Sequence, residues 1–164
     1  MNFEETYTRL FKPILAYIAS RVSSLQTAHE LAADTWQQVW AHQEQFDPSR
    51  GNEQQWVFTI ARNQVNKHLR FWQLKRFFSL TEQEDIIQSG EKAPLEQLAD
   101  QEKKQVLLAV FATLADRERD LLALKFQSGL NNRQIAQMTG LSESNVGTIV
   151  NRALNKLRAR LEDL

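Results

Sequence analysis

The chain has 164 residues, enough for one or two domains, and 42% of them are apolar, which is ordinary for a globular protein. It contains no cysteine, which excludes disulfide frameworks and thiol chemistry, and its charged N-terminus lacks the apolar stretch of a signal peptide. The longest apolar run, residues 106–115, is half of the ~20 residues that a membrane span needs, so we expect a cytoplasmic protein without membrane insertion.

Helical periodicity dominates the chain and we find no convincing alternating strand, so we predict an all-α fold. The first helix is predicted over residues 3–22, where Pro13 either kinks the helix or splits it one residue earlier. A second helix is predicted over residues 27–43. The Pro, Gly and Asn content of residues 46–52 predicts a loop, and a third helix then runs over residues 53–70 or beyond.

Residues 77–102 carry seven acidic groups and one basic group, and they include Gly90 and Pro94. This composition predicts a flexible acidic linker between two small helical domains, residues 1–76 and residues 103–164. The C-terminal domain has the opposite charge balance, with ten basic and six acidic groups.

Helical periodicity resumes after the linker, with helices predicted over residues 101–113 and 116–127. We expect Asp116 to cap the second of these helices. The alternating charges of residues 116–120, DRERD, fit a solvated helix start better than an acid–base site.

Residues 130–157 are typical of a helix-turn-helix. Asn131 can cap a short helix over residues 132–139, and Gly140 can end it in the left-handed conformation. Ser142 can then cap a second helix with a continuous apolar stripe. Two helices joined by a tight glycine turn can place the second helix in a DNA major groove.

The second helix of this motif leaves a polar face outside its apolar stripe. This face comprises Glu143, Ser144, Asn145, Gly147, Thr148, Asn151, Arg152 and Asn155. Asn, Ser and Thr can hydrogen-bond base edges, which favours DNA binding over a plain solvent-exposed face. The helix has no positive charge before Arg152, and phosphate neutralisation supplies most of non-specific DNA affinity. We therefore expect weak DNA binding by the isolated protein and a larger partner that supplies the remaining affinity.

A second polar cluster covers residues 56–76, which mix cations, amides and aromatic side chains. Cations follow phosphates and aromatic faces stack on unpaired bases, but an amphipathic helix with a solvated basic face has the same composition. The sequence leaves both interpretations open. The three histidines are widely spaced and no glycine-rich phosphate loop is present, so we expect no metal site, no cofactor and no catalysis.

Three motifs in chain order resemble the bacterial extracytoplasmic-function (ECF) sigma factors, the smallest class of RNA polymerase specificity subunits. TAHELAADTWQQVW resembles the first long motif of the family, and WVFTIARNQVNKHLR resembles its IARN segment. TLADRERDLLALKF, followed by GLNNRQIAQMTGLSESNVGTIVNRALNKLR, resembles its C-terminal domain. The resemblance covers nearly the whole chain.

The resemblance implies two tethered domains, region 2 and region 4, and a function in promoter recognition and melting rather than catalysis. It implies three partners, which are core RNA polymerase, promoter DNA and an anti-sigma factor. Contacts to the −35 element then fall to Arg133, Ser144, Asn145, Thr148, Asn151, Arg152 and Asn155. Contacts to the −10 element fall to the loop over residues 46–54 and to Arg62, Asn63, Asn66, Lys67 and Arg70. Contacts to the polymerase fall to Glu30, Asp34, Gln37 and Gln38.

The chain departs from the family pattern at several of these positions. Asn66 stands where the family commonly has Asp, and Gly147 and Ile149 stand where its recognition helix usually has Lys and Arg. These departures indicate an unusual promoter sequence. The main alternative is a stand-alone helix-turn-helix regulator with an N-terminal sensor or dimerisation domain, which would have no need of the IARN segment. A helical adaptor that binds only protein would leave the outward Asn and Thr residues unexplained.

Overall fold

The computed structural model describes residues 1–79 and 102–163, and every regular element in these two ranges is a helix. The N-terminal part contains α1 (Phe3–Ala19), α2 (Leu25–His42), the 3-10 helix η1 (Gln43–Gln45) and α3 (Glu53–Ser79). The C-terminal part contains α5 (Glu102–Ala112), α6 (Asp116–Gln127), α7 (Asn132–Thr139) and α8 (Glu143–Glu162). The predicted all-α fold is thus confirmed.

Helices α1, α2 and α3 form an N-terminal bundle around a core of aliphatic and aromatic side chains. Leu10 and Ile14 lie on either side of Pro13 along α1, and both are buried. Because this apolar stripe continues across Pro13, α1 is one helix, which excludes the split, one of the two alternatives that the sequence left open at Pro13. The loop over residues 46–52 is confirmed as non-helical between η1 and α3.

The predicted linker is shorter at both ends than the sequence suggested. Residues 77–79 continue α3, and Glu102 is the first residue of α5. The other predicted linker residues, 80–101, lie outside the described residues. The prediction that Asp116 caps α6 was also wrong, since Ala115 is the N-cap residue and Asp116 is the first helical residue. The Glu118 carboxylate accepts a hydrogen bond from the Ala115 backbone N–H at 3.4 Å, which satisfies a donor at this helix start.

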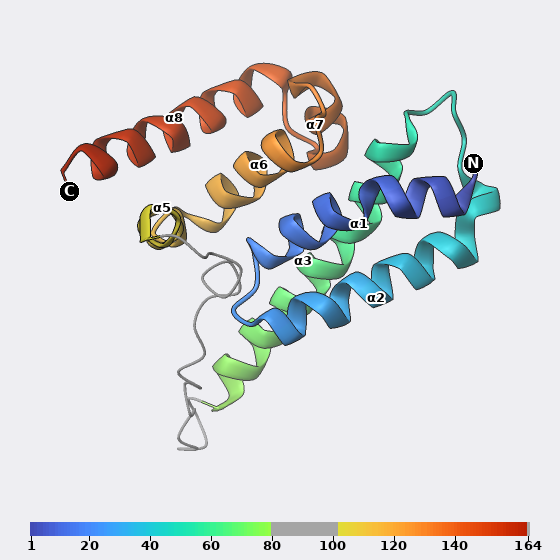
Figure 1. The fold of residues 1–164 in the computed structure, drawn as a ribbon, viewed down its shortest axis with the longest axis horizontal. Helices are drawn as coiled ribbons and strands as arrows, with labels where there is room; N and C mark the ends of the chain where they lie inside the picture. The colour runs from blue at the N-terminus through green and yellow to red at the C-terminus, as the bar shows by residue number, and fades with distance from the viewer. Residues whose placement is uncertain (80–101, 164) are drawn as a thin grey trace.

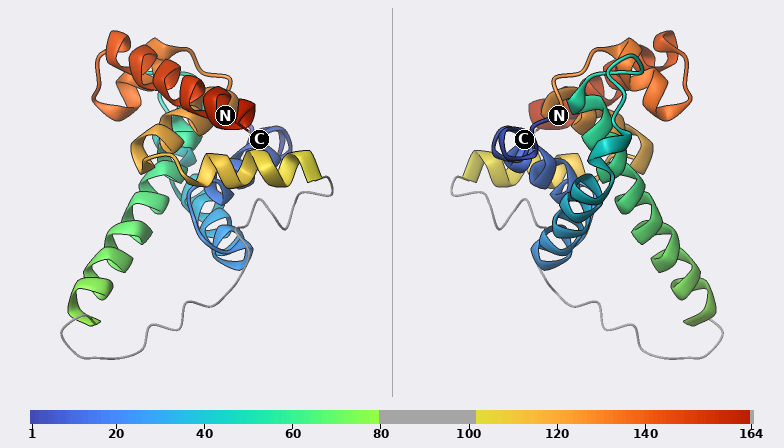
Figure 2. Two further views of the ribbon diagram at one scale, coloured as in Figure 1. Left: turned by 90° about the vertical axis from the view of Figure 1, so that its left-hand side faces the viewer. Right: turned by 90° about the vertical axis from the view of Figure 1, so that its right-hand side faces the viewer.

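Helices α5 to α8 form a C-terminal bundle that lies against the N-terminal bundle (Figure 1). Helix α6 contacts α1, and α7 contacts α3, so the buried apolar residues of both bundles form one continuous cluster. The C-terminal turns of α3 extend away from both bundles in the two side views (Figure 2). The sequence predicted the two bundles but not this contact between them.

Candidate nucleic-acid interface

The start of α7 and the turn between α7 and α8 are held by the three residues that the sequence predicted. Asn131 Oδ1 accepts from the Gln134 backbone N–H at 2.9 Å, and Gln134 Oε1 accepts from the Asn131 N–H at 3.0 Å. Gly140 ends α7 with φ of 73°, and Ser142 Oγ accepts from the Asn145 N–H at 3.1 Å. The left-handed Gly140 and the Ser142 cap define the turn into α8, so the polar face of α8 has a defined orientation.

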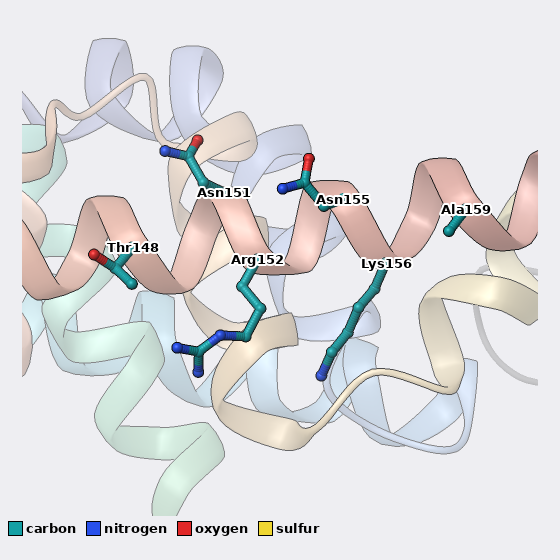
Figure 3. Close-up of a pocket in the computed structure, with 6 residues that line it drawn as sticks. All are labelled: Thr148, Asn151, Arg152, Asn155, Lys156 and Ala159. Carbon is teal, nitrogen blue, oxygen red and sulfur yellow. The ribbon is translucent and has the colours of Figure 1, made fainter.

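One face of α8 is buried, and the opposite face is polar and exposed. Val146, Ile149, Val150 and Ala153 point into the C-terminal bundle. The predicted contact residues Ser144, Asn145, Thr148, Asn151, Arg152 and Asn155 are exposed, as is Arg133 on α7. Several of them line a surface depression, in which Asn151 and Asn155 project to one side of α8 and Arg152 to the other (Figure 3).

The two cations beside these amides have different surroundings. Lys156 donates to Glu118 Oε1 at 2.7 Å, and this hydrogen bond is the main cause that lowers the pKa of Glu118. Arg152, the first cation of α8, is exposed. Because the charge of Lys156 is engaged by Glu118, the face offers mainly neutral hydrogen-bonding groups and depends on Arg152 for positive charge.

The predicted contact residues on α3 fall into two groups. Asn63, Lys67 and Arg70 are exposed. Arg62 and Asn66 are partly buried and bonded to other side chains. Arg62 Nε donates to Asp120 Oδ2 of α6 at 3.0 Å, and Arg21, in the turn after α1, donates to Asn66 Oδ1 at 2.8 Å.

These bonds belong to a network between the two bundles. Tyr17 Oη donates to Asp120 Oδ1 at 2.7 Å, Arg21 Nη1 donates to the Tyr17 oxygen at 3.1 Å, and Arg21 Nη2 donates to Asp116 Oδ2 at 3.2 Å. Burial raises the pKa of Tyr17 well above its usual value and Asp120 raises it further, so the phenol stays protonated and donates. We call Tyr17, Arg21, Arg62, Asn66, Asp116 and Asp120 the interbundle network.

The sequence predicted that the charged side chains of residues 116–120 are solvated. This was wrong for two acidic side chains, which are buried. Asp120 is 3% exposed and Glu118 is 7% exposed. Asp120 lies one turn before the buried Leu124, so the apolar stripe of α6 carries it into the contact between the bundles. Burial of its charge is offset by Tyr17, Arg21 and Arg62.

Comparison with known proteins assigns both halves of the chain to one family. The family model described as Sigma-70 region 2 matches residues 6–73, and that described as Sigma-70, region 4 matches residues 110–159. The ECF RNA polymerase sigma factor SigM of Bacillus subtilis is 25% identical over 97% of this chain and 94% of its own length. The ECF RNA polymerase sigma factor RpoE of Cereibacter sphaeroides is 28% identical over 97% of this chain and 86% of its own length.

The chain belongs to the ECF sigma factors. It is therefore an RNA polymerase sigma factor, which directs core polymerase to promoters and helps to open them for transcription initiation. The alternative of a stand-alone regulator with an N-terminal sensor is not favoured, because the N-terminal bundle itself matches region 2.

Two solved structures share the fold of this ECF sigma factor. One is the sigma factor RpoE in complex with the anti-sigma factor NepR from Bartonella quintana, with a TM-score of 0.77, 23% identity and coverage of 98% of this chain and 97% of that one. The other is CnrH in complex with the cytosolic domain of CnrY, with a TM-score of 0.71, 20% identity and coverage of 98% and 88%.

The residues predicted to bind the polymerase lie along one side of α2. Glu30, Asp34 and Gln37 are exposed, and Gln38 is partly exposed. Within residues 1–79 and 102–163 of the sigma factor, no helix has the length and apolar content needed to cross a membrane. No cluster of His, Cys, Asp or Glu in the same two ranges could hold a metal ion.

Sequence reasoning missed Tyr17, Arg21 and Asp120. One signal for them was present. Tyr17 lies on the strongly apolar face of α1 with Arg21 four residues later, just after the helix, and Asp120 interrupts an apolar stripe in α6. Polar groups at such positions need partners when buried. The sequence did not indicate that the partners come from the other bundle.

Proposed function

We propose that this ECF sigma factor reads a promoter at two places. In the C-terminal bundle, Ser144, Asn145, Thr148, Asn151, Arg152, Asn155 and Arg133 contact the −35 element as duplex DNA. In the N-terminal bundle, the loop over residues 46–54 and Arg62, Asn63, Asn66, Lys67 and Arg70 hold the opened −10 strand. The protein acts as an initiation factor rather than as an enzyme, and it works in the cytoplasm.

The exposed amide face at the middle of α8 is the observation that carries this proposal. Asn151 and Asn155 lie on the same side of the helix and can each pair with a base edge, most favourably adenine, in a major groove (Figure 3). Such contacts specify sequence but neutralise few phosphates, so they provide little affinity by themselves. Core polymerase must therefore supply most of the affinity, and we assign its docking to Glu30, Asp34, Gln37 and Gln38.

The loop before α3 supports the −10 assignment because its conformation is set by its own hydrogen bonds. Asp47 Oδ1 accepts from the Ser49 backbone N–H at 2.9 Å and from the Ser49 hydroxyl at 2.7 Å, and these bonds lower the pKa of Asp47. Asn52 Oδ1 accepts from the Gln55 N–H at 2.8 Å at the start of α3. A preorganised loop can receive a flipped base with little further ordering cost.

We also propose an anti-sigma partner for this protein. The RpoE structure is a sigma factor bound to the anti-sigma factor NepR, the CnrH structure is a complex with the cytosolic domain of CnrY, and both match this chain over nearly its whole length. The anti-sigma factor would keep the protein from core polymerase until a signal releases it.

Reconstitution with purified core polymerase tests the proposal. We expect the protein to co-elute with core polymerase in gel filtration and to start transcription at defined sites on genomic DNA fragments. Asn151→Ala should reduce transcription from those sites by about tenfold, since one good amide–base pair contributes ~1–3 kcal/mol of discrimination. A protein that does not bind core polymerase but binds a palindromic duplex as a dimer would contradict the proposal.

A further inference from the structure

We propose that the Thr148 methyl group contacts the C5-methyl group of a thymine in the −35 element, so that this residue selects thymine at one position. The inference deepens the proposed function and rests on it, because that function places α8 against the base edges of the major groove. Thr148 is exposed and lines the same surface depression as Asn151 and Asn155 (Figure 3).

The hydroxyl group of Thr148 is bonded to the helix itself. Its Oγ1 donates to the Ser144 backbone carbonyl, one turn earlier in α8, at 3.0 Å. A hydroxyl has one proton to donate, so Thr148 cannot donate to a base while this bond holds. The bond also keeps Oγ1 against the preceding turn of the backbone, which restricts the χ1 rotamer. The methyl group is therefore the part of this side chain that is left to contact a ligand.

The major groove offers a specific partner for an exposed methyl group. Thymine presents a C5-methyl group there, whereas cytosine presents an amino donor, and a threonine methyl is one of the side-chain groups that contact the thymine methyl. When the two methyl groups meet, water is excluded from both of them, which is favourable. The contact therefore favours thymine over cytosine at one base pair without adding positive charge to α8.

The position of Thr148 relative to Asn151 fits contacts to neighbouring base pairs. Residues three apart on an α-helix are separated by ~4.5 Å along its axis, which is close to the ~3.4 Å between stacked base pairs. Asn151 is exposed and can pair with an adenine edge. We therefore expect the thymine selected by Thr148 to lie at the base pair next to the one that Asn151 contacts.

Two substitutions separate the methyl contact from a contact through the hydroxyl oxygen, which can still accept a hydrogen bond from a base amino group. Thr148→Ser keeps the hydroxyl and removes the methyl group, whereas Thr148→Val keeps a methyl group and removes the hydroxyl. The matched control is Thr139→Ser. Thr139 also donates to the carbonyl four residues earlier, that of Ile135, at 2.8 Å, but it lies at the end of α7.

The probe is a promoter fragment that the wild-type protein transcribes with core polymerase. Each thymine of its −35 element is replaced in turn by deoxyuridine, which lacks only the C5-methyl group. The affinity of the complete complex of protein and core polymerase for each fragment is then measured at one salt concentration, because phosphate contacts make affinity depend on salt. Effects of deoxyuridine on the DNA itself are common to all variants and cancel when the variants are compared.

We expect one deoxyuridine to weaken binding of the wild-type complex by about fourfold, the effect of exposing one methyl group. Thr148→Ser should bind the unmodified promoter about fourfold more weakly than the wild type does, and it should not respond to deoxyuridine at that position. Thr148→Val and Thr139→Ser should both keep the response of the wild type.

The inference is overturned if no deoxyuridine in the −35 element weakens binding of the wild-type complex, or if Thr148→Ser responds to deoxyuridine as the wild type does. Loss of the response in Thr148→Val would overturn it as well, because the hydroxyl would then be the group that matters. The proposed function fails by a separate result, namely no promoter-specific transcription by the wild-type protein with core polymerase. Promoter-specific transcription without any effect of deoxyuridine would remove only the thymine contact.

Discussion

Arg152 is the first cation of α8 and lies beside the two amides proposed to read the −35 element. A guanidinium at this position can bond guanine or a phosphate, so Arg152→Ala should lower transcription from a cognate promoter by about tenfold. Arg160→Ala is the matched control, because it removes the same charge from an exposed position in the last turn of α8. Run-off transcription with core polymerase measures both variants, and equal losses would mean that only net charge matters.

Glu118 predicts a pH dependence within the C-terminal bundle. The hydrogen bond from Lys156 is the main cause that lowers its pKa below the ordinary value of 4.5. The folded state therefore binds fewer protons than the unfolded state, so this contribution to stability is present above about pH 4.5 and is lost as the pH falls through the folded pKa.

Glu118→Gln should remove this dependence. We expect the variant to be less stable than the wild type at neutral pH, by about 1 kcal/mol, and the difference to shrink as the pH falls through the lowered pKa of Glu118. Urea unfolding followed by circular dichroism at several pH values measures it. A stability difference that stays constant across this range would contradict the assignment of the titrating group.

The sequence predicted the residues that we propose to bind DNA, but it did not predict all of those that hold the two bundles together. The exposed amides of α8 were predicted because a helix with a strong apolar stripe leaves its opposite face outside. Tyr17 and Asp120 were missed because periodicity identifies the buried face of a helix but not the helix that covers it. Tyr17 and Asp120 bond to each other although they are 103 positions apart in the chain, so no local sequence pattern could pair them.

At the scale of the elements, the helix-turn-helix contains two glycines whose replacement by alanine should change stability in opposite directions. Gly140 has φ of 73° and open space around the position of a Cβ, so Gly140→Ala meets only backbone strain. It should lower the free energy of unfolding by about 1 kcal/mol. Gly147 lies inside α8, where a Cβ would meet Asn132 Nδ2 at 3.4 Å, an ordinary contact.

Gly147→Ala should therefore act in the opposite direction and stabilise the protein by up to about 1 kcal/mol through helix propensity. Thermal unfolding of the two variants beside the wild type measures the difference. Destabilisation by Gly147→Ala would indicate that Asn132, whose Oδ1 is buried without a hydrogen-bond partner in the described ranges, cannot adjust to the added methyl group.

The helices themselves were largely predictable, and the errors have physical causes. The caps Asn131 and Ser142 and the stop at Gly140 were predicted from side-chain chemistry and are confirmed. The end of α3 was underestimated because the apolar side chains after Arg70 are not buried, and Phe71 and Leu74 are about 60% exposed. Burial therefore does not mark the end of this helix.

At the scale of the whole molecule, the sequence predicted two bodies and a tether, and the structure adds a contact between the bodies. Composition reveals a domain boundary, but the contact depends on shape and on buried charge pairs formed by both bundles. The structure shows the closed state, with the interbundle network formed, and we infer an open state in which the bundles separate and the network residues are hydrated.

These two states predict how core polymerase binding responds to Asp120→Asn. A ligand that binds only the open form has an apparent dissociation constant equal to its intrinsic value divided by the open fraction. Asp120→Asn should therefore tighten core polymerase binding by the same factor by which it raises the open fraction, until the open form predominates. Spin labels at Glu44→Cys and Arg158→Cys, two exposed positions in this cysteine-free chain, report the open fraction during a titration with core polymerase that also gives the affinity. Equal affinities for proteins with different open fractions would mean that the polymerase binds both states alike and does not drive the opening.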